Sequence, residues 1–293
     1  MRDRHLKYLL MMPAFLLVTA TVIYPLGYAG IISFMDWRLS RSRVPTDFVF
    51  LDNFWRAFFE DPSFLNSLGV TITFVAGSAG GAVLFGLLIA LLLARRGRGY
   101  SIARTVLVLP FAMSPALQGT SFRFFLNPEF GIFDAVLDAL FPFLAHVDWL
   151  GSSGWAMTWL ILTDMWHWGP FLSLMLIGGL LSIPNDTLEA ARVDGASAWT
   201  SFWTVVLPQL MPVLAIAFVL KTVFSFKMFD YVYLLTGGGP GESTSTMTYY
   251  AFRMGFSAYD MGYASAIAFV LALLLVGVST VYFRLLFPKG EAG

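Results

Sequence analysis

The sequence predicts an all-α polytopic membrane protein with about six transmembrane helices. Three observations predict this class: 58% of the 293 residues are hydrophobic, only 12% are charged, and long apolar runs recur along the whole chain. An ordinary soluble domain carries about a quarter charged residues. Lipid is therefore the expected solvent, and no stretch resembles a separate water-soluble domain.

Six apolar runs are long enough to cross a bilayer, because about 20 helical residues span roughly 30 Å of hydrocarbon. They make one predicted transmembrane domain, 1–293, with spans at about 8–34, 68–94, 103–126, 155–181, 208–235 and 264–287. Pro and Gly interrupt the third and fourth runs. Pro110, Pro115 and Gly119 weaken the third helix in a way consistent with a bend or with freed carbonyls lining a cavity. Proline is common in membrane helices, so we favour an ordinary span there.

Basic residues predict the orientation, because Lys and Arg of short loops stay in the cytoplasm. With the N-terminus inside, both termini are cytoplasmic, and ten basic residues face the cytoplasm against five outside. The inner set is Arg2, Arg4, Lys7, Arg95, Arg96, Arg98, Arg104, Arg192, Arg284 and Lys289, and the outer set is Arg38, Arg41, Arg43, Arg56 and Arg253. The total charge balances, with 18 basic and 18 acidic residues, so no nucleic-acid partner is expected.

The loop 182–207, between the fourth and fifth spans, is expected in the cytoplasm and is longer than a turn requires. We predict two short helices in it. Asp186 and Glu189 form a predicted capping pair at the start of the first helix. Asp194-Gly195 marks a bend, and the second helix, Ser197 to Val206, runs into Pro208.

The same loop carries a long spaced motif. Glu189-Ala190-Ala191 is followed after three residues by Gly195, and after nine more by Val205-Val206-Leu207-Pro208. Glu-Ala-Ala alone is a common helix start, so the spacing carries the resemblance. The motif resembles the EAA loop in the membrane subunits of binding-protein-dependent ATP-binding-cassette (ABC) importers. The resemblance implies a type I importer permease with a coupling helix that docks on a separate ATPase subunit through Glu189, Ala190, Ala191, Asp194 and Gly195.

Further stretches are similar to carbohydrate-type permeases of this family. They are Phe229-Asp230, Leu235-Thr236-Gly237-Gly238-Gly239-Pro240, Ser243-Thr244 and Gly262-Tyr263-Ala264-Ser265-Ala266. The resemblance implies the first permease of a maltose-type or glycerol-phosphate-type importer in a bacterial inner membrane. The implied partners are a second homologous permease, two ATPase subunits, an extracytoplasmic solute-binding protein and a sugar, polyol or sugar derivative. Phe122, Asp134 and Met211 depart from the family pattern, which leaves the substrate open.

No bond chemistry is expected of this chain. It has no G-x-x-x-x-G-K-[ST] phosphate loop, so we expect ATP and Mg²⁺ on the partner ATPase and no cofactor or catalytic residue here. His5, His146 and His167 lack metal-ligand spacing, so no metal site is expected, and His167 is predicted to be packed between Trp166 and Trp168. The rival classes need other features. A secondary transporter or channel needs no cytoplasmic docking loop such as 182–207. A membrane enzyme needs clustered carboxylates or histidines.

Charged residues within the spans are candidates for the substrate pathway, since each costs roughly 2.5 to 3.5 kcal/mol at a helix centre. At about 100° per residue, one face of the fifth span holds Lys221, Phe224, Lys227, Met228 and Tyr231. Aromatic faces stack on sugars, and lysines donate to hydroxyls or pair with anions.

Asp164 of the fourth span joins this candidate set, and an alternative remains open for the charges. Lys227 can pair with Asp230, and Lys221 with Asp164, as purely structural ion pairs. If Lys221 instead reaches the substrate, an anionic or sulfonated sugar is favoured over a neutral one.

Overall fold

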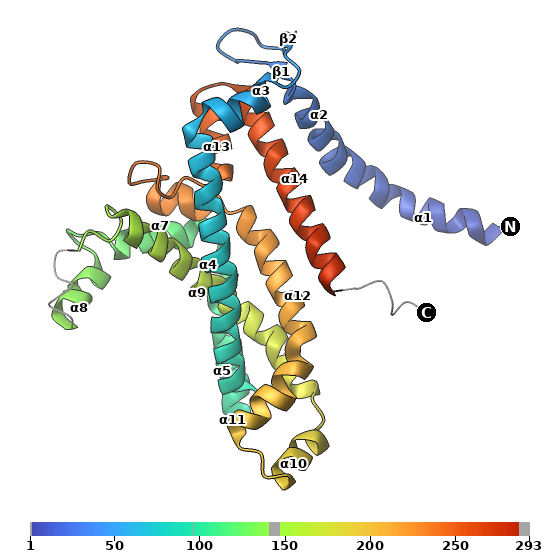
Figure 1. The fold of residues 1–293 in the computed structure, drawn as a ribbon, viewed down its shortest axis with the longest axis vertical. Helices are drawn as coiled ribbons and strands as arrows, with labels where there is room; N and C mark the ends of the chain where they lie inside the picture. Colours follow the sequence, from blue (N-terminus) through green and yellow to red (C-terminus); the bar gives the residue numbers. More distant parts are fainter. Residues whose placement is uncertain (1, 96, 141–146, 287–293) are drawn as a thin grey trace. The chain divides into compact units, whose positions relative to one another are not determined.

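A computed structural model describes residues 2–95, 97–140 and 147–286, and these residues are almost entirely helical (Figure 1). Arg96, His146, Lys289 and the last residue of the predicted sixth span lie outside the described residues. The chain divides into two compact units, which we describe separately. Unit 1 comprises Met1–Leu65 and Tyr250–Leu274, and unit 2 comprises Asn66–Tyr249 and Leu275–Gly293.

Unit 1 begins with an apolar helical run and continues into a polar segment. The run consists of α1 (Arg2–Val18), the π-helical turn η1 (Thr19–Ile23) and α2 (Tyr24–Ile32). A two-stranded antiparallel ribbon follows, in which β1 (Met35–Asp36) pairs with β2 (Asp47–Phe48). The remaining short elements are α3 (Asp52–Trp55), η2 (Arg56–Glu60) and η6 (Arg253–Ser257).

Three helices contribute residues to both units. They are α4 (Pro62–Leu93), α13 (Met247–Phe252) and α14 (Met261–Leu286).

Unit 2 holds the other helices. In chain order they are α5 (Arg98–Leu107), α6 (Leu109–Ala112), α7 (Pro115–Phe125), α8 (Ile132–Leu140), α9 (Ser153–Ser182), α10 (Asn185–Val193), α11 (Ala198–Ser201), η4 (Phe202–Val206), α12 (Leu207–Phe226) and η5 (Val232–Thr236). Helices α9 and α12 pack against each other. The apolar core of this unit includes Phe74, Leu126, Leu160 and Tyr231.

Five helices of the described chain are long and apolar enough to cross a bilayer: Tyr8–Ile32, Pro62–Leu93, Ser153–Ser182, Ala198–Phe226 and Met261–Arg284. A sixth candidate is a broken pair, Arg98–Ala112 and Pro115–Phe125, bent by 90°. The predicted fold class, a polytopic helical membrane protein with about six spans, is confirmed.

The break in the third span corrects our expectation of an ordinary helix there. Met113 and Ser114 leave the helical conformation, with ψ values of 140° and 143°. Ser114 then caps α7 by accepting a hydrogen bond from the Leu117 N–H at 3.3 Å. Pro115 follows as the first residue of α7, where its missing N–H costs nothing. The fourth span shows the opposite outcome, because Pro170 lies inside an uninterrupted α9.

The fifth span differs from its predicted bounds at both ends. Its helix begins in the loop at Ala198 and ends at Phe226, so the prediction of one helix over 208–235 is wrong. Residues 227–229 are not helical, and the chain resumes helical structure at Asp230. Side chains beyond Phe226 therefore do not continue the 100° spacing that placed them on one face.

Candidate functional site

Helix α10 forms the first arm of the predicted cytoplasmic loop 182–207, which we call the elbow. Pro184 precedes the first helical residue, Asn185, and provides no side-chain cap. Asp186 therefore lies within the first turn. Its negative charge there interacts favourably with the helix dipole, but its side chain is not at the N-cap position. Among the described residues, neither Asp186 nor Glu189 makes a side-chain hydrogen bond. The predicted capping pair is wrong because the helix starts two residues earlier than the pair requires.

Gly195 ends this arm. Its φ of +79° lies in the left-handed region, which glycine adopts without a steric penalty. The Gly195 N–H bonds the Arg192 carbonyl at 3.0 Å, and the Ala196 N–H bonds the Ala191 carbonyl at 3.0 Å. These two bonds are the Schellman arrangement, which satisfies the last free carbonyls of a helix.

Ser197 starts the second arm. Its hydroxyl accepts a hydrogen bond from the Thr200 N–H at 3.1 Å and so caps α11. The helix continues through η4 into α12 without a break, so the arm and the fifth span form one helical run, Ala198–Phe226.

The elbow presents a free surface. Glu189, Ala190, Asp194 and Gly195 are exposed, while Ala191 is half-buried. Three large apolar side chains are also exposed: Val193 at 87%, Trp199 at 71% and Trp203 at 50%. Exposed tryptophans beside small residues and charges are typical of a protein interface.

A buried ion pair links α9 and α12. Lys221 Nζ lies 2.7 Å from Asp164 Oδ2, and both side chains are fully buried. The ammonium group also donates to the hydroxyls of Ser78 at 2.8 Å and Ser225 at 2.6 Å. Ser78 in turn hydrogen-bonds Asp164. Three helices, α4, α9 and α12, therefore meet at one charged cluster.

One acceptor in this cluster is unsatisfied. Asp164 Oδ1 is buried and has no hydrogen-bond partner among the described residues. The Trp168 ring lies beside the cluster, 5.3 Å from Lys221 Nζ, and its centroid is 4.8 Å from that of Phe224. A spare acceptor next to aromatic faces can receive a hydroxyl donor from a ligand.

A second polar network, which the sequence did not reveal, forms where the third span breaks. Gln118 Nε2 donates to the Pro110 carbonyl at 2.5 Å and to His167 Nδ1 at 2.9 Å, and Tyr231 donates to Gln118 Oε1 at 2.6 Å. The Pro110 carbonyl also accepts from the Met113 N–H at 3.2 Å, so it is shared between the last turn of α6 and the Gln118 side chain. The only sequence signal for Gln118 was an uncharged polar residue in an apolar run. His167 is packed as predicted, with its ring against Trp168 and Phe111 and its Nδ1 hydrogen-bonded to Gln118.

The five residues predicted to share a face do not all do so. Lys221, Met228 and Tyr231 are buried, whereas Phe224 and Lys227 are exposed. Lys227 Nζ lies 5.3 Å from the Phe224 ring. In the part of the chain that the structure describes, Lys227 makes no ion pair with Asp230. Of the two structural pairings considered from sequence, only the one between Lys221 and Asp164 forms.

The glycine-rich stretch after η5 is an ordered loop of unit 2. Gly237 and Gly238 have φ values of +62° and +82°. Tyr249 donates to the Gly237 carbonyl at 2.8 Å, and the hydroxyls of Thr236 and Thr244 lie 2.8 Å apart. These bonds give the loop a defined conformation.

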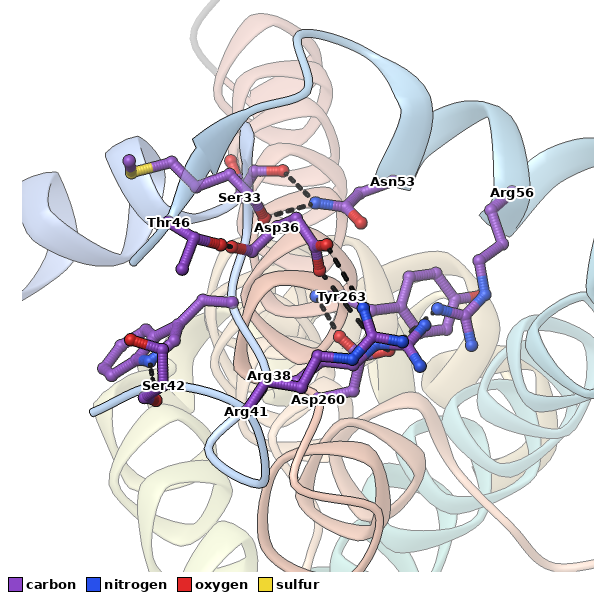
Figure 2. A network of polar contacts seen from close by, with 12 residues as sticks. Ser33, Asp36, Arg38, Arg41, Ser42, Thr46, Asn53, Arg56, Asp260 and Tyr263 are labelled. Atoms are coloured by element: carbon purple, nitrogen blue, oxygen red, sulfur yellow. Dashed lines mark hydrogen bonds and ion pairs between the residues drawn. The ribbon is translucent and has the colours of Figure 1, made fainter. Parts of the chain in front are cut away.

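Unit 1 carries a separate polar network, shown in Figure 2. Arg56 Nη1 lies 2.8 Å from Asp260 Oδ2, and Arg38 Nε lies 3.6 Å from the same oxygen. Asn53 donates from Nδ2 to the carbonyls of Ser33 and Met35, each at 3.0 Å. The network ties the strand pair and α3 to the start of α14.

Asp61 extends that network. Its Oδ2 accepts hydrogen bonds from the hydroxyls of Tyr250 and Tyr263, both at 2.5 Å. Its Oδ1 accepts from the N–H groups of Ser63 and Phe64 at 2.9 Å and 3.2 Å. Burial alone raises the pKa of Asp61, but these four hydrogen bonds outweigh it and hold the pKa below its usual value.

Residues 82–289 match the family described as the binding-protein-dependent transport system inner membrane component, which is well over half of the chain. The chain belongs to this family. It is therefore a membrane permease subunit of an ABC importer that works with a solute-binding protein. The predicted resemblance and the absence of an enzymatic role for this subunit are confirmed by this membership.

Related proteins align along nearly the whole chain. The sulfoquinovosyl glycerol transport system permease protein SmoG of Agrobacterium fabrum is 34% identical over 287 residues, covering 98% of this chain and 92% of the relative. The trehalose/maltose transport system permease protein MalF of Thermococcus litoralis is 32% identical, covering 97% and 94%. The sn-glycerol-3-phosphate permease protein UgpA of Pectobacterium atrosepticum is 31% identical, covering 97% and 94%.

Two crystal structures share the fold. One is a bacterial ABC transporter involved in the import of the acidic polysaccharide alginate, with a TM-score of 0.83, 20% identity and coverage of 97% of this chain and 96% of that chain. The other is an alginate transporter in complex with its alginate pentasaccharide-bound periplasmic protein, with a TM-score of 0.82, 19% identity and coverage of 100% and 97%. At this identity the likeness concerns the fold.

Proposed function

We propose that this chain pairs with a second homologous permease to form the translocation path for a sugar, a polyol or a sugar derivative. Two ATPase subunits bind ATP and Mg²⁺ in the cytoplasm, and an extracytoplasmic solute-binding protein delivers the substrate. The transport names of the relatives, which concern sulfoquinovosyl glycerol, trehalose or maltose, and glycerol phosphate, support this class.

The observation that carries the proposal is the elbow of α10 and α11. Its exposed residues Glu189, Ala190, Asp194 and Gly195, with the half-buried Ala191, form the surface that docks on the ATPase. ATP-driven closure of the ATPase pair pushes this surface. Because the second arm is continuous with α12, the push tilts the span that carries Lys221 and so alternates access to the path.

The substrate pathway in this proposal is lined by Lys221, Phe224, Lys227, Met228, Tyr231 and Asp164. An anionic sugar derivative suits it best, because a sulfonate or carboxylate can compete with Asp164 for the ammonium of Lys221. The free Oδ1 of Asp164 then accepts a sugar hydroxyl. The relative named for the transport of sulfoquinovosyl glycerol supports this substrate class.

Orientation is the first experimental test. The chain has no cysteine, so single cysteines report their positions without background. We expect Ser197→Cys to resist a membrane-impermeant maleimide in intact spheroplasts and to react after permeabilisation. Asp47→Cys, on the proposed outer side, should react in both. Labelling of Ser197→Cys in intact spheroplasts would place the elbow outside and end the proposal.

Coupling is tested by charge reversal on the elbow. Glu189→Arg should abolish co-purification with the ATPase and energised uptake, while Glu60→Arg, an exposed acidic residue of unit 1, should leave both intact. Equal behaviour of the two variants contradicts the docking role.

Substrate contact is tested in the assembled complex. Lys221→Met should abolish the stimulation of ATPase activity by an anionic sugar, whereas Gln209→Met, at an exposed position of α12 outside the proposed pathway, should leave it unchanged. Unchanged stimulation in Lys221→Met removes Lys221 from the pathway.

A further inference from the structure

The corner between α4 and α5 is strongly basic and lacks acidic residues. From residue 62 to residue 128 the sequence contains no Asp or Glu, whereas Arg95, Arg98 and Arg104 cluster within ten residues. Arg96 belongs to the same run but lies outside the described residues.

Arg104 holds the corner in one shape. Its Nη2 donates to the Leu93 carbonyl at 2.6 Å and to the Arg95 carbonyl at 2.7 Å, and its Nε donates to Leu93 at 3.1 Å. These bonds satisfy carbonyls left free where α4 ends. Arg95 and Arg98 are exposed, and in the described part of the chain their side chains make no ion pair or hydrogen bond. Arg95 and Arg98 therefore present two exposed guanidinium groups that have no partner among the described residues.

An apolar stripe runs away from Arg98. Ile102, Val106 and Leu109 are 65%, 55% and 61% exposed. At about 100° per residue they lie within an arc of roughly 80° from Arg98. The stripe is about 16 Å long at 1.5 Å per residue, close to half of a bilayer's hydrocarbon thickness of roughly 30 Å. It accordingly has the length of one leaflet.

A groove adjoins the stripe. Its volume is about 400 Å³, and its lining is formed by Arg104, Thr105, Val108, Leu109, Ala112 and Leu174. The lining is apolar apart from the guanidinium of Arg104 and the hydroxyl of Thr105. The groove is apolar, and Arg104 in its lining also bonds the Arg95 carbonyl, so the groove and the corner together suit an amphiphile that carries a negative head and a hydrocarbon tail.

We propose that this corner is a binding site for an anionic phospholipid of the cytoplasmic leaflet. The headgroup phosphate is held by Arg95 and Arg98, and an acyl chain follows the stripe of Ile102, Val106 and Leu109, the last of which also lines the groove. A zwitterionic headgroup is disfavoured because it brings a cation to a corner without a carboxylate to receive it. The inference goes beyond the transport role, and it depends on the chain spanning a membrane with the proposed orientation, which places this corner in the cytoplasm.

The site has a structural consequence. Helices α5 and α6 lead directly to the 90° break before Pro115 and to Gln118 in the buried network. A bound lipid fixes the first half of this broken span, so it should raise the thermal midpoint of the complex.

The test is a lipid titration of the purified importer complex in detergent, read by native mass spectrometry with palmitoyl-oleoyl phosphatidylglycerol and the matching phosphatidylcholine. Each basic residue near an anionic lipid contributes roughly fivefold in affinity, so Arg95→Gln/Arg98→Gln should bind phosphatidylglycerol about 30-fold more weakly. Arg95→Lys/Arg98→Lys keeps the charges and the membrane topology, and it should bind within about threefold of wild type. Arg284→Gln removes an arginine from another element and should bind like wild type.

Equal affinity of the wild-type complex for the two lipids overturns the proposal, and so does undiminished phosphatidylglycerol binding by the double Gln variant. If that variant fails to assemble, the wild-type complex still decides: the preference for phosphatidylglycerol must fall as salt is raised from 0.1 M to 1 M, because screening weakens exposed charge contacts. Glycerol phosphate without an acyl chain should neither bind nor raise the thermal midpoint. If it reproduces the effect of the lipid, the site is a phosphate site and the lipid assignment is wrong.

Discussion

Lys221 on α12 and Asp164 on α9 form an ion pair of 2.7 Å, and neither side chain has exposed surface. The pair is surrounded by the hydroxyls of Ser78 and Ser225 rather than by water. Breaking a buried pair of this kind is costly because each charge would stay buried without its partner to compensate it. The pair makes the junction of α4, α9 and α12 specific, and any ligand that enters must replace one of the two charges.

Removing one partner should be much worse than removing both. Lys221→Met leaves a bare carboxylate and Asp164→Leu leaves a bare ammonium, each with an expected cost of about 3 to 5 kcal/mol. The double variant Lys221→Met/Asp164→Leu should recover most of that loss. Thermal unfolding of the purified complex measures this cycle, with Lys227→Met as an exposed control. Additive losses in the double variant would contradict the buried pairing.

Gln118 should contribute to stability through three partners. Gln118→Leu removes the hydrogen bonds to the Tyr231 hydroxyl, His167 Nδ1 and the Pro110 carbonyl. The expected loss in the free energy of unfolding is about 1 to 3 kcal/mol. Gln209→Leu makes the same chemical change at an exposed position of α12 and should have little effect. Thermal midpoints of the two variants provide the comparison, and equal midpoints would show that the network is not stabilising.

Asp61 should make the stability of unit 1 depend on pH. Its pKa is lowered in the folded chain, so the ionised form stabilises unit 1 above the usual carboxyl pKa of about 3.8. That stabilisation is lost as the pH falls through the lowered value. In Asp61→Asn the thermal midpoint should lose this dependence between pH 6 and pH 3, while Asp47→Asn, an exposed control, should retain it. A wild-type pH profile in Asp61→Asn would contradict the role of the tyrosine hydrogen bonds.

Gly195 should be required for the bend of the elbow. An alanine at φ +79° costs roughly 1 to 2 kcal/mol, because its Cβ approaches the following carbonyl. Gly195→Ala should therefore lower the thermal midpoint and uncouple ATP hydrolysis from uptake. Gly178→Ala introduces the same methyl group into α9, where nothing lies within 4 Å, and should be tolerated. Normal coupling in Gly195→Ala would mean that the elbow does not need this bend.

Local features of the chain were predictable because their causes lie within a few residues of one another. The apolar runs marked most of the spans by length alone, and Asp194-Gly195 marked the turn between α10 and α11 by its backbone requirement. The capping pair failed by two residues, since Pro184 rather than Asp186 precedes the helix. The break after Ala112 was suggested by Pro110 and Pro115, but composition could not distinguish a bent span from a straight one such as α9, which contains Pro170.

The sequence by itself determined that the chain crosses a membrane several times, that its charges are confined to few positions and that an elbow with family spacing follows the fourth span. Only the tertiary structure decided which buried polar groups meet: Lys221 with Asp164 rather than Lys227 with Asp230, and Gln118 with Tyr231, 113 residues apart. The physical reason is that a buried charge or amide must find its partner across packed helices. That choice depends on where α12 ends and where the third span bends, and neither residue spacing nor composition contains this information.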